Sequence, residues 1–64
     1  MKQVIIDAIA LLSDEYRDVI TLRFFEYKDY EDISDILEIP PGTVATRLNR
    51  AKKKLHTLLI SHIA

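Results

Sequence analysis

The 64-residue sequence contains no cysteine, no tryptophan, one glycine and two prolines. Without cysteine, the chain can form neither a disulfide scaffold nor a thiolate zinc site, the usual supports of very small domains. It also lacks an apolar run of about 18 residues, the length that a membrane-spanning helix needs. The N-terminal residues do not combine a long apolar segment with a small-residue cleavage site, so no secretory signal is predicted. We therefore expect a cytoplasmic protein without membrane insertion.

The length and the remaining composition predict a single domain over residues 1–64. A chain of this size buries only about 60% of its unfolded surface and cannot support two cores. Its hydrophobic content of 48% is ordinary for a globular protein and is too high for a disordered tail.

The net charge of −1 conceals a split along the chain. Residues 1–38 hold all ten acids and four bases, a net charge of −6, whereas residues 39–64 hold five bases and no acid, a net charge of +5. Such an asymmetry is more informative about partners than the total. Charge alone leaves two interpretations equally open. Either the basic part binds nucleic acid, or an acidic face is simply solvated beside a basic helix. The five bases of the second part are Arg47, Arg50, Lys52, Lys53 and Lys54.

The apolar spacing predicts an all-α fold, a small domain of four helices. Ser13 and Asp29 are expected to cap the second and third helices, because their side-chain oxygens can accept hydrogen bonds from first-turn N–H groups. Pro41 is expected to open the last helix, where its missing N–H costs nothing. The expected helices cover residues 4–12, 14–27, 30–37 and 41–61.

The last predicted helix has two different faces at 100° per residue. One face is an apolar stripe that is expected to pack on the core, formed by Val44, Leu48, Ala51, Leu55 and Leu58. The other face is polar, basic and almost free of bulky apolar groups, and it carries Gly42, Ala45, Thr46, Asn49, Arg50 and Lys53.

A short acid-capped helix, a tight turn and a longer basic helix predict a helix-turn-helix over about residues 29–55. In that motif the second helix fits the major groove of DNA. Arg50 and Asn49 can make paired hydrogen bonds to base edges. Thr43 and Thr46, with the N–H groups at the helix start, can bind phosphate. The residues leave open an alternative without DNA binding, because two short helices that meet at a Pro-containing corner also occur in purely structural helical bundles.

Three stretches of the sequence resemble region 4 of bacterial RNA polymerase sigma factors, most of all the extracytoplasmic-function group. They are residues 17–26 (RDVITLRFFE), 30–33 (YEDI) and 42–55 (GTVATRLNRAKKKL). The resemblance covers roughly residues 11–55. It implies a four-helix domain that recognises the −35 promoter element and docks on the flap of the polymerase β subunit.

The resemblance also assigns roles to side chains of the last predicted helix. Thr46, Asn49 and Arg50 match positions that face bases in the family. Thr43 and Arg47 match positions that contact the DNA backbone. Lys53 and its two lysine neighbours are expected to add sequence-independent attraction that salt weakens.

Arg47 also lies near the edge of the apolar stripe on the helical wheel. An ion pair with an acid of the preceding helix, Glu31 or Asp35, is therefore an alternative to a phosphate contact. The sequence leaves both roles open.

Two residues depart from the family pattern. Glu38 stands at a turn position that is usually glycine, and a positive φ there would cost a glutamate on the order of 1 kcal/mol. Ala45 stands where the family often has lysine or arginine, which removes a DNA contact. We therefore expect weak DNA binding by this domain alone and dependence on polymerase.

No constellation of residues predicts catalysis, a cofactor or a metal site, so we expect no enzyme. His56 and His62 are six residues apart, roughly 120° around a helix, and do not converge as metal ligands would. The paired acids fit helix starts, without a nucleophile–base pair or a phosphate-binding loop beside them.

The main alternative function is a protein-interaction module with weak or no DNA binding. Apolar residues near both ends of the chain extend beyond what one small core can cover: Val4, Ile5, Ile6, Leu58, Leu59, Ile60 and Ile63. By resemblance, such surfaces are where anti-sigma factors hold region 4 away from DNA; self-association is another explanation. Region 2, which recognises the −10 element, is absent from the sequence. We therefore expect either a domain of a longer sigma factor or a stand-alone relative.

Overall fold

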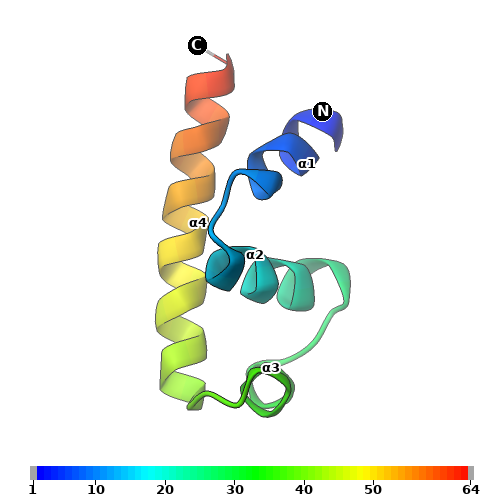
Figure 1. Cartoon of the computed structure of the whole chain (residues 1–64), viewed down its shortest axis with the longest axis vertical. Helices are drawn as coiled ribbons and strands as arrows, with labels where there is room; N and C mark the ends of the chain where they lie inside the picture. The colour runs from blue at the N-terminus through cyan, green and yellow to red at the C-terminus, as the bar shows by residue number, and fades with distance from the viewer. Residues whose placement is uncertain (1, 64) are drawn as a thin grey trace.

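The computed structural model describes the backbone of residues 2–63 and the side chains of residues 3–61. Within this range the chain forms helices and no strand, so the predicted all-α fold with a helix-turn-helix is confirmed (Figure 1). None of the described helices is long and apolar enough to cross a membrane. The elements are α1 (Lys2–Ala10), α2 (Asp14–Ile20), the π-helical turn η1 (Thr21–Phe25), α3 (Tyr30–Leu37) and α4 (Pro41–Ile63).

Helix α4 is the longest of the described helices, and the other helices pack against it. Its 23 residues give a length of about 35 Å, close to the longest dimension of 37 Å. The other helices pack along one side of it, with α3 near its N-terminal end and α1 beside its C-terminal part (Figure 1). The opposite side of α4 is therefore left for solvent or a partner.

The core forms where α1, α2 and α3 meet the inner side of α4. The predicted stripe of α4 is confirmed, since Val44, Leu48 and Ala51 are buried and Leu55 and Leu58 pack against them while partly exposed. The remaining members of the buried cluster are Ile9, Leu12, Val19, Ile20 and Ile33.

Asp29 and Pro41 begin their helices as predicted. The Asp29 carboxylate accepts a hydrogen bond from the Asp32 N–H at 2.9 Å, which satisfies one first-turn donor of α3. Pro41 is the first residue of α4, and the Pro40 carbonyl accepts from the N–H groups of both Thr43 and Val44.

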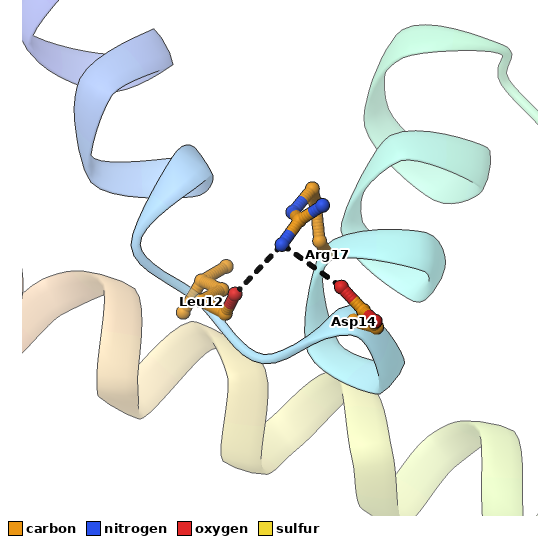
Figure 2. Close-up of polar contacts among 3 residues, drawn as sticks. All are labelled: Leu12, Asp14 and Arg17. Atoms are coloured by element: carbon orange, nitrogen blue, oxygen red, sulfur yellow. Dashed lines mark hydrogen bonds and ion pairs between the residues drawn. The ribbon is translucent and has the colours of Figure 1, made fainter.

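Ser13 is the N-cap residue of α2, as predicted, but the expected side-chain hydrogen bond is absent. Its backbone is extended and its carbonyl accepts from the Arg17 N–H at 2.9 Å, while its side chain makes no capping hydrogen bond. The side-chain contacts at this junction come from Arg17, as Figure 2 shows. Its guanidinium donates to the Leu12 carbonyl at 3.1 Å and pairs with Asp14 at 3.0 Å. One arginine thus joins the end of the α1–α2 connection to the first turn of α2.

The second helix is not the uniform α-helix that was predicted over residues 14–27. Its final turn, η1, is wider, because the Glu26 N–H donates to the Thr21 carbonyl five residues earlier, at 3.1 Å. A π-turn of this kind accommodates an extra residue in a helix. The helix ends at Phe25, and Tyr27 follows with φ of 57°.

The turn between α3 and α4 contains the second positive-φ residue. Glu38 has φ of 56° and ψ of 46°, and its N–H donates to the Ser34 carbonyl. The Ile39 N–H also donates to this carbonyl, while the Ser34 hydroxyl donates to the Ile39 carbonyl. The turn thus requires the left-handed conformation that the family pattern implies, and Glu38 adopts it although glycine would do so without strain.

Candidate nucleic-acid interface

The candidate interface is the outward side of the first half of α4. The short turn after α3 sends the chain into α4, and α3 packs against that helix (Figure 1). The side chains opposite the core stripe follow the spacing i, i+3, i+4 and i+7, which places them on one face. Thr46, Asn49, Arg50 and Lys53 are all exposed on this face.

The charge of this face has one sign. Residues Pro41–Ile63 include no aspartate or glutamate. Arg50 and Lys53 lie one turn apart and are exposed, so each cation is available to an incoming anion. The predicted concentration of positive charge on one helix is therefore present at the surface.

None of the residues that the structure describes covers Gly42 at the start of α4. A Cβ atom at Gly42 would meet nothing within 4 Å, and its backbone is not in the positive-φ region. Neither the packing nor the backbone of the domain requires a glycine there. The bare surface leaves room for close approach of another molecule.

The two threonines at this end differ in exposure. Thr46 is exposed, and its hydroxyl donates to the Gly42 carbonyl at 3.0 Å. The Thr46 oxygen keeps its acceptor capacity, but it can donate to a phosphate only after rotation. Thr43 is partly buried and lies at the border of the face.

Arg47 has a different partner from those predicted. Its guanidinium lies 3.9 Å from the Glu15 carboxylate of α2, and 27% of the Arg47 side chain is exposed. The predicted pairing with Glu31 or Asp35 of α3 is therefore wrong. Arg47 lies on the side of α4 that approaches α2, so the nearby acid comes from the first turn of α2.

Lys52 also lies away from the candidate interface. Its ammonium is 5.4 Å from the centre of the Phe24 ring, a distance at which a cation is attracted to an aromatic face. The three consecutive lysines therefore differ in their surroundings. Lys53 belongs to the face of Thr46 and Arg50, and the exposed Lys54 follows Arg50 by four residues at the border of that face.

Beside Lys52 lies an apolar groove between α1, η1 and α4, with a volume of about 350 Å³. Phe24 and Phe25 line it and are 46% and 54% exposed. Adjacent phenylalanines on a helix cannot both enter one core, which is the sequence signal for this groove. The remaining lining residues are Ile5, Ile9, Ile20, Lys52, Leu55, His56 and Leu59.

The residues considered for metal binding do not form a site in the part of the chain that the structure describes. No group of three or more His, Asp or Glu side chains there could hold a metal ion. His56 lines the apolar groove. The side chains of His62 and Ile63 lie outside the described residues.

A sequence model of the family described as "Sigma-70, region 4" matches residues 2–55. The chain belongs to this family. The match covers all of α1 to α3, the turn and the basic part of α4. The region 4 fold expected from the resemblance is thus the observed one, with the helix-turn-helix formed by α3 and α4.

Several curated proteins resemble this region 4 domain. The ECF RNA polymerase sigma-E factor of Haemophilus influenzae is 36% identical over 55 residues, which cover 86% of this chain and 29% of that protein. The ECF RNA polymerase sigma factor SigW of Bacillus subtilis is 41% identical over 51 residues, covering 80% and 27%. The RNA polymerase sigma-H factor of Pseudomonas aeruginosa is 39% identical over 51 residues, covering 80% and 26%. The chain thus spans less than a third of the length of these relatives.

Proposed function

We propose that this region 4 domain binds the −35 element of promoter DNA and acts in transcription initiation as part of a sigma factor. The observation that carries the proposal is the exposed, acid-free face of α4 with Thr46, Asn49, Arg50 and Lys53. This face belongs to the second helix of a helix-turn-helix, the helix that enters the major groove. The domain has no proposed enzymatic role.

Within this face, the chemistry of each side chain suggests its task. Arg50 can donate two hydrogen bonds to guanine, and Asn49 can pair with adenine. Thr46 can add a hydrogen bond to a base edge or to the backbone of the DNA. Thr43 and Arg47 at the border are proposed to contact the DNA backbone, which fixes the register without reading sequence. Lys53 is proposed to neutralise a phosphate.

The same surface supports only weak binding by the domain alone. Ala45 provides no cation where the family often has one, Lys52 lies over Phe24, and Arg47 lies beside a carboxylate. Only Arg50, Lys53 and Lys54 of the α4 cations are therefore exposed without such a neighbour in the part of the chain that the structure describes, and most of the affinity for DNA depends on neutralising phosphates. We propose that polymerase holds the domain at the promoter.

The test is an amide NMR titration of the isotope-labelled chain with duplexes recovered by selection from a random pool at low salt. NMR detects weak binding as well as its location. We expect the shifts to concentrate on residues 42–53 and to be larger for selected than for scrambled duplexes. Shifts confined to α1 and η1, or none, contradict the proposal.

The apolar groove favours a second function, the binding of a protein. Its walls are apolar, and two phenylalanines stay half exposed at its edge, a pattern typical of protein-interaction sites. The named relatives are RNA polymerase sigma factors. We therefore propose that this groove docks an apolar segment of the β subunit flap of RNA polymerase. An anti-sigma factor that covers it would compete with polymerase.

A binding assay with the isolated β flap tests this docking. Phe25→Ser removes an exposed ring from the groove and is expected to weaken flap binding at least about tenfold, as for an interface anchor. Tyr27→Ser is the matched control, because Tyr27 is an aromatic residue that is 85% exposed and outside the groove. Equal effects of the two changes contradict docking in the groove, and dimers of the free chain favour self-association.

A further inference from the structure

The ion pair between Arg47 and Glu15 joins the border of the proposed DNA surface to α2. The nearest nitrogen and oxygen are 3.9 Å apart, longer than the 2.7–2.9 Å of a charge-assisted hydrogen bond. The two groups therefore attract each other without a directional bond. The Glu15 side chain is 68% exposed, so solvent and other ions reach it.

The position of Arg47 on α4 makes this pair relevant to DNA. Arg47 is one turn from Thr43 and three residues from Arg50, the spacing of neighbours on a helix surface. A phosphate held by Thr43 or Arg50 thus comes close to the Arg47 guanidinium. If Arg47 contacts that phosphate, it must do so with the Glu15 carboxylate beside it, and this carboxylate has the same sign of charge as the phosphate.

We propose that Glu15 restrains anion binding at the border of α4 by competing with phosphate for Arg47. This inference concerns the DNA surface proposed above and adds a residue from outside the helix-turn-helix. In the free domain, the carboxylate neutralises part of the Arg47 charge and repels phosphates of any sequence. Glu15 thereby lowers non-specific binding, while base recognition by Asn49 and Arg50 is unaffected.

The neighbouring acid Asp14 provides a matched control. Asp14 also lies in the first turn of α2, and its side chain is 89% exposed. Its partner is Arg17, at 3.0 Å, and not a residue of α4. Asp14→Asn and Glu15→Gln remove the same charge from adjacent positions, but only the second change releases Arg47.

The test compares duplex binding of the full chain and its variants over a series of salt concentrations. Glu15→Gln is expected to increase the affinity for selected and scrambled duplexes alike by roughly twofold to fivefold, the range of an exposed ion pair. Its salt dependence should steepen by about one phosphate contact. Adding Arg47→Ala should abolish both effects, and circular dichroism checks that every variant is folded.

Three results would overturn the inference: no change in Glu15→Gln, a loss of affinity, or an equal gain in Asp14→Asn. A loss of affinity would show that Glu15 holds Arg47 in an orientation that favours DNA binding. An equal gain in both variants would show that removing any negative charge of α2 strengthens binding. Heparin chromatography separates this question from the proposed function, since heparin is a polyanion without base sequence. If duplexes do not bind, the inference is still supported when Glu15→Gln elutes later from heparin and the added Arg47→Ala removes this delay. Unchanged elution of Glu15→Gln overturns the inference.

Discussion

The two halves of α4 belong to one uninterrupted helix but pack differently. In the first half, Val44, Leu48 and Ala51 are at most 1% exposed. In the second half, Leu55, Leu58 and Leu59 are only partly buried, and Ile60 is half exposed. The first half packs into the core with α2 and α3, whereas α1 lies beside the second half (Figure 1).

This difference separates two kinds of recognition. Side chains on the outward face of the first half are held on a fully packed backbone, as hydrogen bonding to base edges requires. The second half leaves apolar surface uncovered, which suits a partner that supplies the missing packing. One helix can therefore present a polar surface to DNA and an apolar surface to a protein without a change in its secondary structure.

The largest expected effect is on stability. Leu48→Ala should lower the free energy of unfolding by about 2–5 kcal/mol, because it leaves a cavity at a buried leucine. Leu58→Ala, in the second half, should cost less because that side chain is already partly solvated. Urea unfolding followed by circular dichroism measures both. Equal losses would show that the two halves are equally packed.

Arg50→Ala tests whether the first half reads bases. It should weaken binding to the selected duplex by about 1–3 kcal/mol, the value of one bidentate base contact, with little change in stability because Arg50 is exposed. Arg50→Lys keeps the charge but not the planar fork, so it should lose sequence preference and keep non-specific affinity. Unchanged binding of the alanine variant would exclude this recognition face.

Glu38→Gly tests the turn that positions the first half. Since Glu38 has positive φ, glycine should relieve strain and stabilise the domain by up to about 1 kcal/mol. Thermal melting measures the change, and the selected duplex should bind as before. A lower melting temperature would show that the Glu38 side chain contributes more than its backbone strain costs.

The smallest expected effect distinguishes adjacent lysines. Lys53→Ala should weaken binding to all duplexes similarly and reduce the salt dependence by about one phosphate contact. Lys52→Ala removes the same charge but should affect DNA binding less, because Lys52 lies over Phe24 in the apolar groove. Identical salt titrations of the two variants would contradict the proposed boundary between the surfaces.

Local rules explain what could be predicted from the sequence. Asp29 and Pro41 begin helices because capping and the missing proline N–H act within one turn. The stripe from Val44 to Ala51 follows from helical periodicity alone. These features depend only on neighbours along the chain, so the fold and the outward face of α4 were both predictable.

Features that depend on distant segments were not predictable in this way. Arg47 has its nearest acid on α2 rather than α3, because the packing of whole helices decides which acid is close. The hydrogen bond from Arg17 to the Leu12 carbonyl depends on how the α1–α2 connection folds back, whereas the pair of Arg17 with Asp14 follows the i, i+3 spacing within α2. The apolar groove forms only where α1, η1 and α4 come together. Its one indication in the sequence was the adjacent pair Phe24 and Phe25.

The π-turn η1 bears on how the groove responds to a change in chain length. Such a turn holds one residue more than an α-turn, so deleting one residue within 21–25 lets the segment adopt α geometry. Each residue of an α-helix turns the chain by about 100°, so a deletion within α2 would rotate the phenylalanines that follow it, whereas the change from π to α geometry absorbs a deletion within η1. The second helix is therefore expected to tolerate the loss of one residue in η1 better than the loss of one residue in α2.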